Sequence, residues 1–163
     1  MFPEGIQGSE GSGPSRPATI LPTRGRLALT HLVDTSVIFR LAEPSVRAGI
    51  DPLANGGRIG RGGITDLEVG YGARNSREWD QVAADLSIFD LVETTRDHVQ
   101  RARQVQRLLA SKSHRGRKIP DLLIAAAAEQ AGLMLLHYDR DFEMIADVTG
   151  QKCGWVVLSG TVD

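Results

Sequence analysis

The stretch KIPDLLIAAAAEQAGLMLLHYDRDF, residues 118–142, predicts a helix, a strand and the start of a second helix in direct succession. Every residue from 122 to 128 is apolar, and Pro120 suits the first turn of a helix, where no backbone N–H is required. Gly132 suits the end of that helix, and the apolar run LMLLH that follows indicates a buried strand. A buried helix joined directly to a buried strand is typical of sheets that carry helices on their faces.

Asp121 begins this otherwise apolar helix, and two explanations are open for it. An acid in the first turn is favoured by the positive end of the helix dipole, and for Asp121 alone this explanation is preferred. A buried site that needs a carboxylate would produce the same pattern. The choice therefore depends on where the other acids of the chain lie.

Apolar runs and helical periodicities alternate along the rest of the chain. Strands are predicted at 27–33 and 154–159, and 89–93 is ambiguous. Helices are predicted at 35–42, from Pro44 to about Ala54, and at 64–75, 77–88, 96–110 and 141–148. Strands separated by helices predict an α/β fold with a central parallel sheet flanked by helices on both faces.

The glycine-rich stretch NGGRIGRGG, residues 55–63, is predicted to be a loop. Its two arginines, Arg58 and Arg61, are weak candidates for phosphate binding and are interpreted as part of a plain linker. The stretch lacks the G-x-x-x-x-G-K-[ST] pattern, so it is not a nucleotide-binding P-loop.

The predicted helix after this loop has an apolar face formed by Ile64, Leu67 and Tyr71. These residues recur at the spacing of one helical face, and Glu68 lies beside them. Glu68 is thus an acid on a helix whose neighbouring positions are mostly apolar.

The length predicts a single domain that folds without disulfides or a structural metal, since 163 residues are enough to bury a sizeable core. The single Cys153 leaves no internal disulfide, and 19 basic against 20 acidic residues leave no overall basic field for nucleic acid. Residues 1–26 hold four of the seven prolines and lack the apolar segment of a secretory signal. We expect a disordered Gly/Pro/Ser-rich tail over 1–26, a single domain over 27–163, no membrane span and a cytoplasmic location.

Two acids follow predicted strands directly: Asp34 after 27–33 and Asp139 after LMLLHY. In an open α/β sheet the functional site lies beyond the carboxyl ends of the strands, although a strand-to-helix turn also favours Asp as a cap. If Asp34, Glu68, Asp121 and Asp139 converge, their mutual repulsion requires compensation. A hard divalent cation such as Mg²⁺ or Mn²⁺ provides it, and it also activates water for attack on a phosphodiester.

Four strings carry these acids in order: LVDTSV at 32–37, LEVGYG at 67–72, IPDLLIAAAAE at 119–129 and LLHYDRDF at 135–142. They resemble the four acidic motifs of PIN-domain ribonucleases. The likeness is greatest to the VapC toxins of VapBC toxin–antitoxin pairs, mycobacterial members in particular, and covers about residues 31–158. Single tripeptides of this kind are common, whereas four motifs in this order are a strong signal.

The resemblance implies a PIN fold in which Asp34, Glu68, Asp121 and Asp139 match the metal-site acids. In the family these acids bind one or two Mg²⁺ or Mn²⁺ ions, and RNA is cut by metal-activated water. Ser36 matches a hydroxyl that often follows the first acid by two positions; a Ser that caps a helix start explains it equally well.

The fourth motif contains a second acid and a histidine. Asp139 lies nearer the strand end and is preferred as the site residue, while Asp141 is interpreted as an acid in the first turn of the next helix. Many relatives carry a hydroxyl residue where this chain has His137, and a packed or hydrogen-bonded His is expected there rather than a metal ligand.

The segment SKSHRGRK, residues 111–118, contains four basic side chains and ends close to Asp121. We expect Arg115, Arg117 and Lys118 to hold RNA phosphates, with a solvated surface loop as the alternative, and we expect Ser36 to contact the RNA as well. The resemblance further implies a structured cellular RNA substrate such as a transfer or ribosomal RNA. It also implies a VapB-like antitoxin that blocks the site, and a homodimer.

Two other functions are compatible with parts of the pattern. The first is a catalytically inactive PIN-like protein that binds RNA or acts as a scaffold, against which the presence of all four acids argues. The second is a phosphatase with Asp34 as nucleophile; that class uses a D-x-D motif, and Ser36 stands where the second acid belongs.

Overall fold

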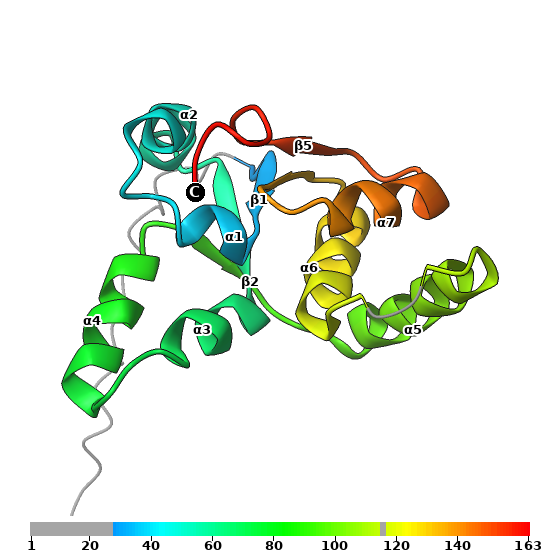
Figure 1. The fold of residues 1–163 in the computed structure, drawn as a ribbon. Helices are drawn as coiled ribbons and strands as arrows, with labels where there is room; N and C mark the ends of the chain where they lie inside the picture. The colour runs from blue at the N-terminus through cyan, green and yellow to red at the C-terminus, as the bar shows by residue number, and fades with distance from the viewer. Residues whose placement is uncertain (1–27, 115–116) are drawn as a thin grey trace, which may run out of the picture.

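The computed structural model describes residues 28–114 and 117–163, so the tail expected at 1–26 lies outside the described residues. Five strands form one sheet in the order β3-β2-β1-β4-β5, and every neighbouring pair is parallel (Figure 1). The predicted central parallel sheet is therefore confirmed. The strands are β1 His31–Val33, β2 Ile59–Gly62, β3 Asp90–Val92, β4 Met134–His137 and β5 Cys153–Trp155.

Helices cover both faces of the sheet, as predicted. Successive residues of a strand point to opposite faces, so Leu32 packs with α5, α6 and α7, whereas Val33 packs with α1, α2 and α4. The helices are α1 Thr35–Ile38, α2 Pro44–Asn55, α3 Gly63–Gly70, α4 Ser76–Leu86, α5 Arg96–Ser111, α6 Ile119–Gln130 and α7 Asp141–Thr149. No helix in the described ranges is long and apolar enough to cross a membrane.

The glycine-rich stretch is not a loop, because β2 occupies Ile59–Gly62 and all four of its residues are buried. A Cβ atom on Gly60 would lie 2.9 Å from the carbonyl oxygen of Asp90, so glycine permits the close approach of β3. The interpretation of Arg61 as a linker residue is also wrong. Its Nε and Nη2 donate to the two carboxylate oxygens of Asp66 at 2.5 and 3.0 Å, and Nη1 donates to the carbonyls of Leu86 and Phe89.

The three residues of the predicted apolar face of α3 do not share one environment: Ile64 packs against the core, whereas Leu67 is 66% exposed and Tyr71 is 93% exposed. The helix instead buries Thr65 and Gly70. Trp79 of α4 lies against Gly70, where a Cβ would come within 2.6 Å of the indole nitrogen. A side chain larger than glycine at position 70 would collide with this indole, so α3 and α4 pack closely at Gly70.

Candidate active site at the carboxyl ends of β1 and β4

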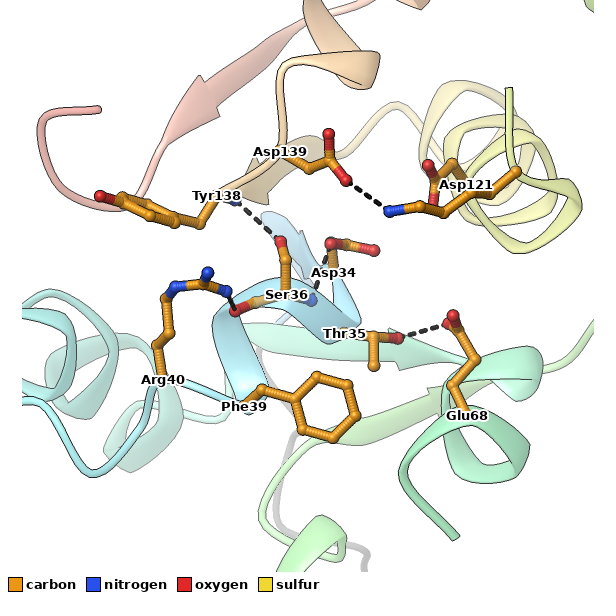
Figure 2. A pocket seen from close by; sticks show the side chains of 10 residues that line it. Asp34, Thr35, Ser36, Phe39, Arg40, Glu68, Asp121, Tyr138 and Asp139 are labelled. Atoms are coloured by element: carbon orange, nitrogen blue, oxygen red, sulfur yellow. Dashed lines mark hydrogen bonds and ion pairs between the residues drawn. The ribbon is translucent and has the colours of Figure 1, made fainter. Parts of the chain in front are cut away.

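A cavity of about 250 Å³ opens beyond the ends of β1 and β4 (Figure 2). The strand order reverses at β1, which pairs with β2 on one side and β4 on the other, and such a switch point is where open parallel sheets form their sites. All four predicted acids line this cavity. The lining residues are Asp34, Thr35, Ser36, Phe39, Arg40, Glu68, Lys118, Asp121, Tyr138 and Asp139.

Asp34 follows β1 and caps α1. Its Oδ2 accepts a hydrogen bond from the Ser36 amide at 2.8 Å, so the capping role is real. Capping is not the only role open to Asp34, because the residue is only 3% exposed and lines the cavity. Burial raises the pKa of Asp34 against the effect of the Ser36 hydrogen bond, and the nearby Glu68 carboxylate raises it further.

Glu68 reaches the cavity from α3 and is held by a hydroxyl that the sequence did not single out. Thr35 Oγ1 donates to Glu68 Oε2 at 2.6 Å and lies 3.4 Å from the hydroxyl of Thr65. Both threonines are buried. The only sequence signal for Thr35 was its place directly after Asp34, which does not distinguish a positioning hydroxyl from an ordinary helix-start residue.

Asp121 lies in the first turn of α6 with 4% exposure, and its Oδ2 has no hydrogen-bond partner in the described part of the chain. Burial raises the pKa of Asp121 to about 7, and the neighbouring Asp34 adds to this while Lys118 opposes it. The helix dipole explains why an acid is tolerated at this position. It does not explain why one carboxylate oxygen is buried without a hydrogen bond from the described residues, since such burial is energetically costly.

Asp139 and Asp141 form a turn at the start of α7, in which the Asp141 amide donates to Asp139 Oδ1 at 3.0 Å. Burial acts to raise the pKa of Asp139, but hydrogen bonds from the Asp141 amide and Lys118 outweigh it and lower the pKa. Carboxylate oxygens of Asp121, Asp139 and Asp141 lie within 4.8 Å of one another. Asp141 is paired with Arg117 and does not line the cavity, so it is a fifth acid at the edge of the site.

Ser36 and His137 support this arrangement. Ser36 Oγ accepts from the Tyr138 amide at 2.9 Å and so joins α1 to the end of β4. His137 is fully buried between Phe142 and Trp155, with ring centroids 5.2 and 5.0 Å away. Its Nδ1 accepts from the Asp139 amide at 3.3 Å, in line with the expectation of a packed histidine.

The three basic residues predicted to bind RNA are placed unequally. Lys118 lines the cavity and donates to Asp139 Oδ2 at 2.8 Å. Arg117 forms its ion pair with Asp141 instead. Arg115 lies outside the described residues.

The cavity suits a hard divalent cation. Its acidic donors are all carboxylate oxygens, which Mg²⁺ and Mn²⁺ prefer. Asp121 offers a buried oxygen that has no hydrogen-bond partner among the described residues, and burial raises the pKa values of Asp34 and Asp121, so both carboxylates are costly to ionise without a nearby cation. A bound dication would remove both costs.

Comparison with known proteins identifies the family. The PIN domain model matches residues 31–148. The chain belongs to the PIN domain family. This VapC-like protein is 59% identical to Ribonuclease VapC51 of Mycobacterium tuberculosis over 137 residues, 84% of this chain and all of the relative. It is 43% identical to Ribonuclease VapC21 of the same species, over 80% of this chain and 96% of the relative.

Solved structures share the fold of this VapC-like chain. The DNA-bound VapBC of Salmonella typhimurium gives a TM-score of 0.66 at 22% identity, covering 79% of this chain and 99% of that one. FitAcB of Neisseria gonorrhoeae gives 0.60 at 19% identity, over 76% and 96% of the two chains.

Proposed function

We propose that this VapC-like protein is a metal-dependent endoribonuclease. The observation that carries the proposal is the convergence of Asp34, Glu68, Asp121 and Asp139 on one cavity, where residues 28–114 and 117–163 supply no hydrogen-bond partner for the buried Oδ2 of Asp121. The relatives that span most of the chain are named ribonucleases, which supports RNA as the substrate.

The four acids would hold Mg²⁺, or Mn²⁺ in its place. When bound, the ion supplies an activated water and stabilises negative charge that develops on the phosphodiester. The protein contributes position: the Ser36 amide holds Asp34, and the Thr35 hydroxyl holds Glu68. Lys118, already in the cavity, is free to move from Asp139 to a substrate phosphate once the charge of Asp139 is neutralised.

The partners follow from the relatives and are part of the proposal. Structures with this fold include VapBC complexes, among them a DNA-bound one, and a toxin–antitoxin complex from Klebsiella pneumoniae. We infer that this chain is a toxin of the same kind, acting in the cytoplasm on a structured RNA such as a transfer or ribosomal RNA. A VapB-like antitoxin would cover the acidic cavity, and the toxin would form a homodimer.

The test compares wild type with Asp121→Asn for cleavage of total bacterial RNA, with Mn²⁺ and with EDTA. We expect cleavage by wild type that EDTA abolishes, and none by a folded Asp121→Asn variant, with folding checked by circular dichroism. Asp80→Asn, an exposed acid on α4, is the matched control and should cut like wild type.

The main alternative, an inactive RNA-binding or scaffold protein, makes a different prediction for metal. A scaffold needs no Mn²⁺, so calorimetry that detects no Mn²⁺ binding to wild type would favour it. Equal cleavage by wild type and Asp121→Asn would remove Asp121 from the site and leave it as a helix-start residue only.

A further inference from the structure

Arg40 stands out among the residues of the cavity. Two cations line it, and of these Lys118 is paired with Asp139, whereas Arg40 has no carboxylate partner within the described ranges. Arg40 donates from Nη1 to the Ser36 carbonyl at 2.9 Å, while its Nε is buried without a hydrogen-bond partner in the described residues. An unpaired guanidinium beside a group of acids is unusual, because arginine normally forks onto a carboxylate or a phosphate.

The guanidinium is held in place by an aromatic ring. Arg40 Cζ lies 4.6 Å from the centroid of Tyr138, a cation–π contact (Figure 2). The Tyr138 hydroxyl is fixed in turn, since it donates to the Val162 carbonyl at 2.8 Å and accepts from the Gly160 amide at 2.9 Å. The arginine is therefore preorganised without being neutralised, which suits binding of an anion that the chain itself does not supply.

Phe39, the next residue, adds an aromatic surface to the same cavity. Its side chain is 62% exposed, although an apolar ring gains by burial. Proteins that bind single-stranded RNA stack unpaired bases on exposed aromatic rings and hold the backbone with nearby cations. Phe39 and Arg40 offer these two groups side by side.

We propose that Arg40 and Phe39 form a nucleotide subsite next to the acids. Arg40 binds the phosphate adjacent to the one that is cut, and Phe39 stacks the base of that nucleotide. This subsite rests on the proposed nuclease function and deepens that function. If the subsite exists, the RNA crosses the cavity as a single strand. The subsite also explains why no carboxylate of the described residues pairs with Arg40, although the cavity is acidic.

The first experiment separates RNA binding from metal binding. The probe is a short single-stranded oligoribonucleotide that carries a site cut by wild type. We expect Arg40→Gln to raise the KM for this RNA about tenfold or more, as for loss of a hydrogen-bonded charge. Mn²⁺ affinity measured by calorimetry should stay at the wild-type value. The slope of log affinity against log salt should fall by about 0.7, the value for one phosphate contact on a single strand.

Controls match each change. Arg103→Gln removes an exposed arginine of α5 that does not line the cavity, and it should leave the KM and salt slope unchanged. Phe39→Leu keeps an apolar side chain but loses the ring face, so it should raise the KM. Its control is Val99→Ala, which shortens an exposed apolar side chain on α5 and should leave the KM unchanged.

A chemical double-mutant cycle locates the contact on the RNA. Replacing one phosphate at a time by a neutral methylphosphonate should weaken binding to wild type most at the position next to the cut, and the same replacement should cost Arg40→Gln nothing further. An abasic nucleotide at that position should likewise weaken wild type but not Phe39→Leu. If Arg40→Gln does not fold, the scan on wild type alone decides: absence of a sensitive neighbouring phosphate overturns the subsite.

Failure of the subsite is distinguishable from failure of the proposed function. Wild type that neither binds Mn²⁺ nor cuts RNA refutes the nuclease. Wild type that cuts RNA, with folded Arg40→Gln and Phe39→Leu variants of unchanged KM, refutes only the subsite. Equal losses of RNA and Mn²⁺ affinity in Arg40→Gln also refute it, since Arg40 would then act through the acids.

Discussion

The ammonium group of Lys118 donates to Asp139 Oδ2 at 2.8 Å, so an intrinsic cation occupies one oxygen of the acidic cavity. Lys118 is the residue before the first turn of α6, and Asp139 follows β4. Because the lysine side chain is 62% exposed, the contact is readily exchanged with solvent ions or substrate. The Lys118 ammonium group is therefore a counter-ion of Asp139, and a divalent metal that binds Asp139 Oδ2 would have to displace it.

Replacing this counter-ion should tighten metal binding. We expect Lys118→Gln to lower the Kd for Mn²⁺ at low salt by roughly fivefold, about 1 kcal/mol, because a positive charge beside the site is removed. RNA affinity should fall in the same variant. Calorimetry checks the first effect and filter binding the second, with the exposed Lys112→Gln as control. Unchanged or weaker Mn²⁺ binding would contradict the role of Lys118 as a competing cation.

Asp121 should make the stability of the metal-free protein depend on pH. Its pKa is raised from 3.8 to about 7 in the folded chain, so the stability gained from its protonation is fully present below about pH 4, declines as pH rises and is lost as pH passes through 7. Asp121→Asn removes this loss. In EDTA the variant should melt above wild type, and the difference in Tm should be larger at about pH 8 than at about pH 5. A constant difference across this range would show that Asp121 is not protonated in the folded state.

Thr35 should act on catalysis through Glu68. Thr35→Val is close in shape but leaves the Glu68 carboxylate without its 2.6 Å hydrogen bond. Since a hydrogen bond to a charged group contributes about 1.5–3 kcal/mol, kcat should fall about tenfold or more. Thr35→Ser keeps the hydroxyl and should retain most activity. Equal activity of the Val and Ser variants would show that the hydroxyl does not position Glu68.

Arg61 should be important for stability rather than for RNA. It is 9% exposed and joins β2 to Asp66 on α3 and to the carbonyls of Leu86 and Phe89. Arg61→Met leaves these partners unpaired, and we expect a loss of about 3–5 kcal/mol in the free energy of unfolding. Urea denaturation measures it. The exposed Arg58→Met should change stability by less than about 0.5 kcal/mol. A similarly small effect at Arg61 would argue against a structural role for the Arg61–Asp66 ion pair.

Local sequence patterns were sufficient for much of the fold and for the positions of the acids. The apolar run of α6 and the adjoining β4 could be recognised because a fully buried helix and strand need apolar residues at nearly every position. The parallel order of strands and helices then placed Asp34 and Asp139 at the same edge of the sheet. These features depend on neighbouring residues and on general rules of chain topology.

Other features were decided by contacts between residues far apart in the chain. Strand β2 has little β propensity of its own, and it exists because β1 and β3 hydrogen-bond to it and Gly60 lets them approach. The close packing of Trp79 on Gly70 of α3 was not indicated by the apolar spacing of that helix. No sequence pattern indicated that Tyr138 would hold Arg40, about a hundred positions earlier. The sequence therefore indicated which acids meet at one edge of the sheet, and tertiary packing decided their partners, because burial and pairing are set by whichever distant side chains meet in the folded chain.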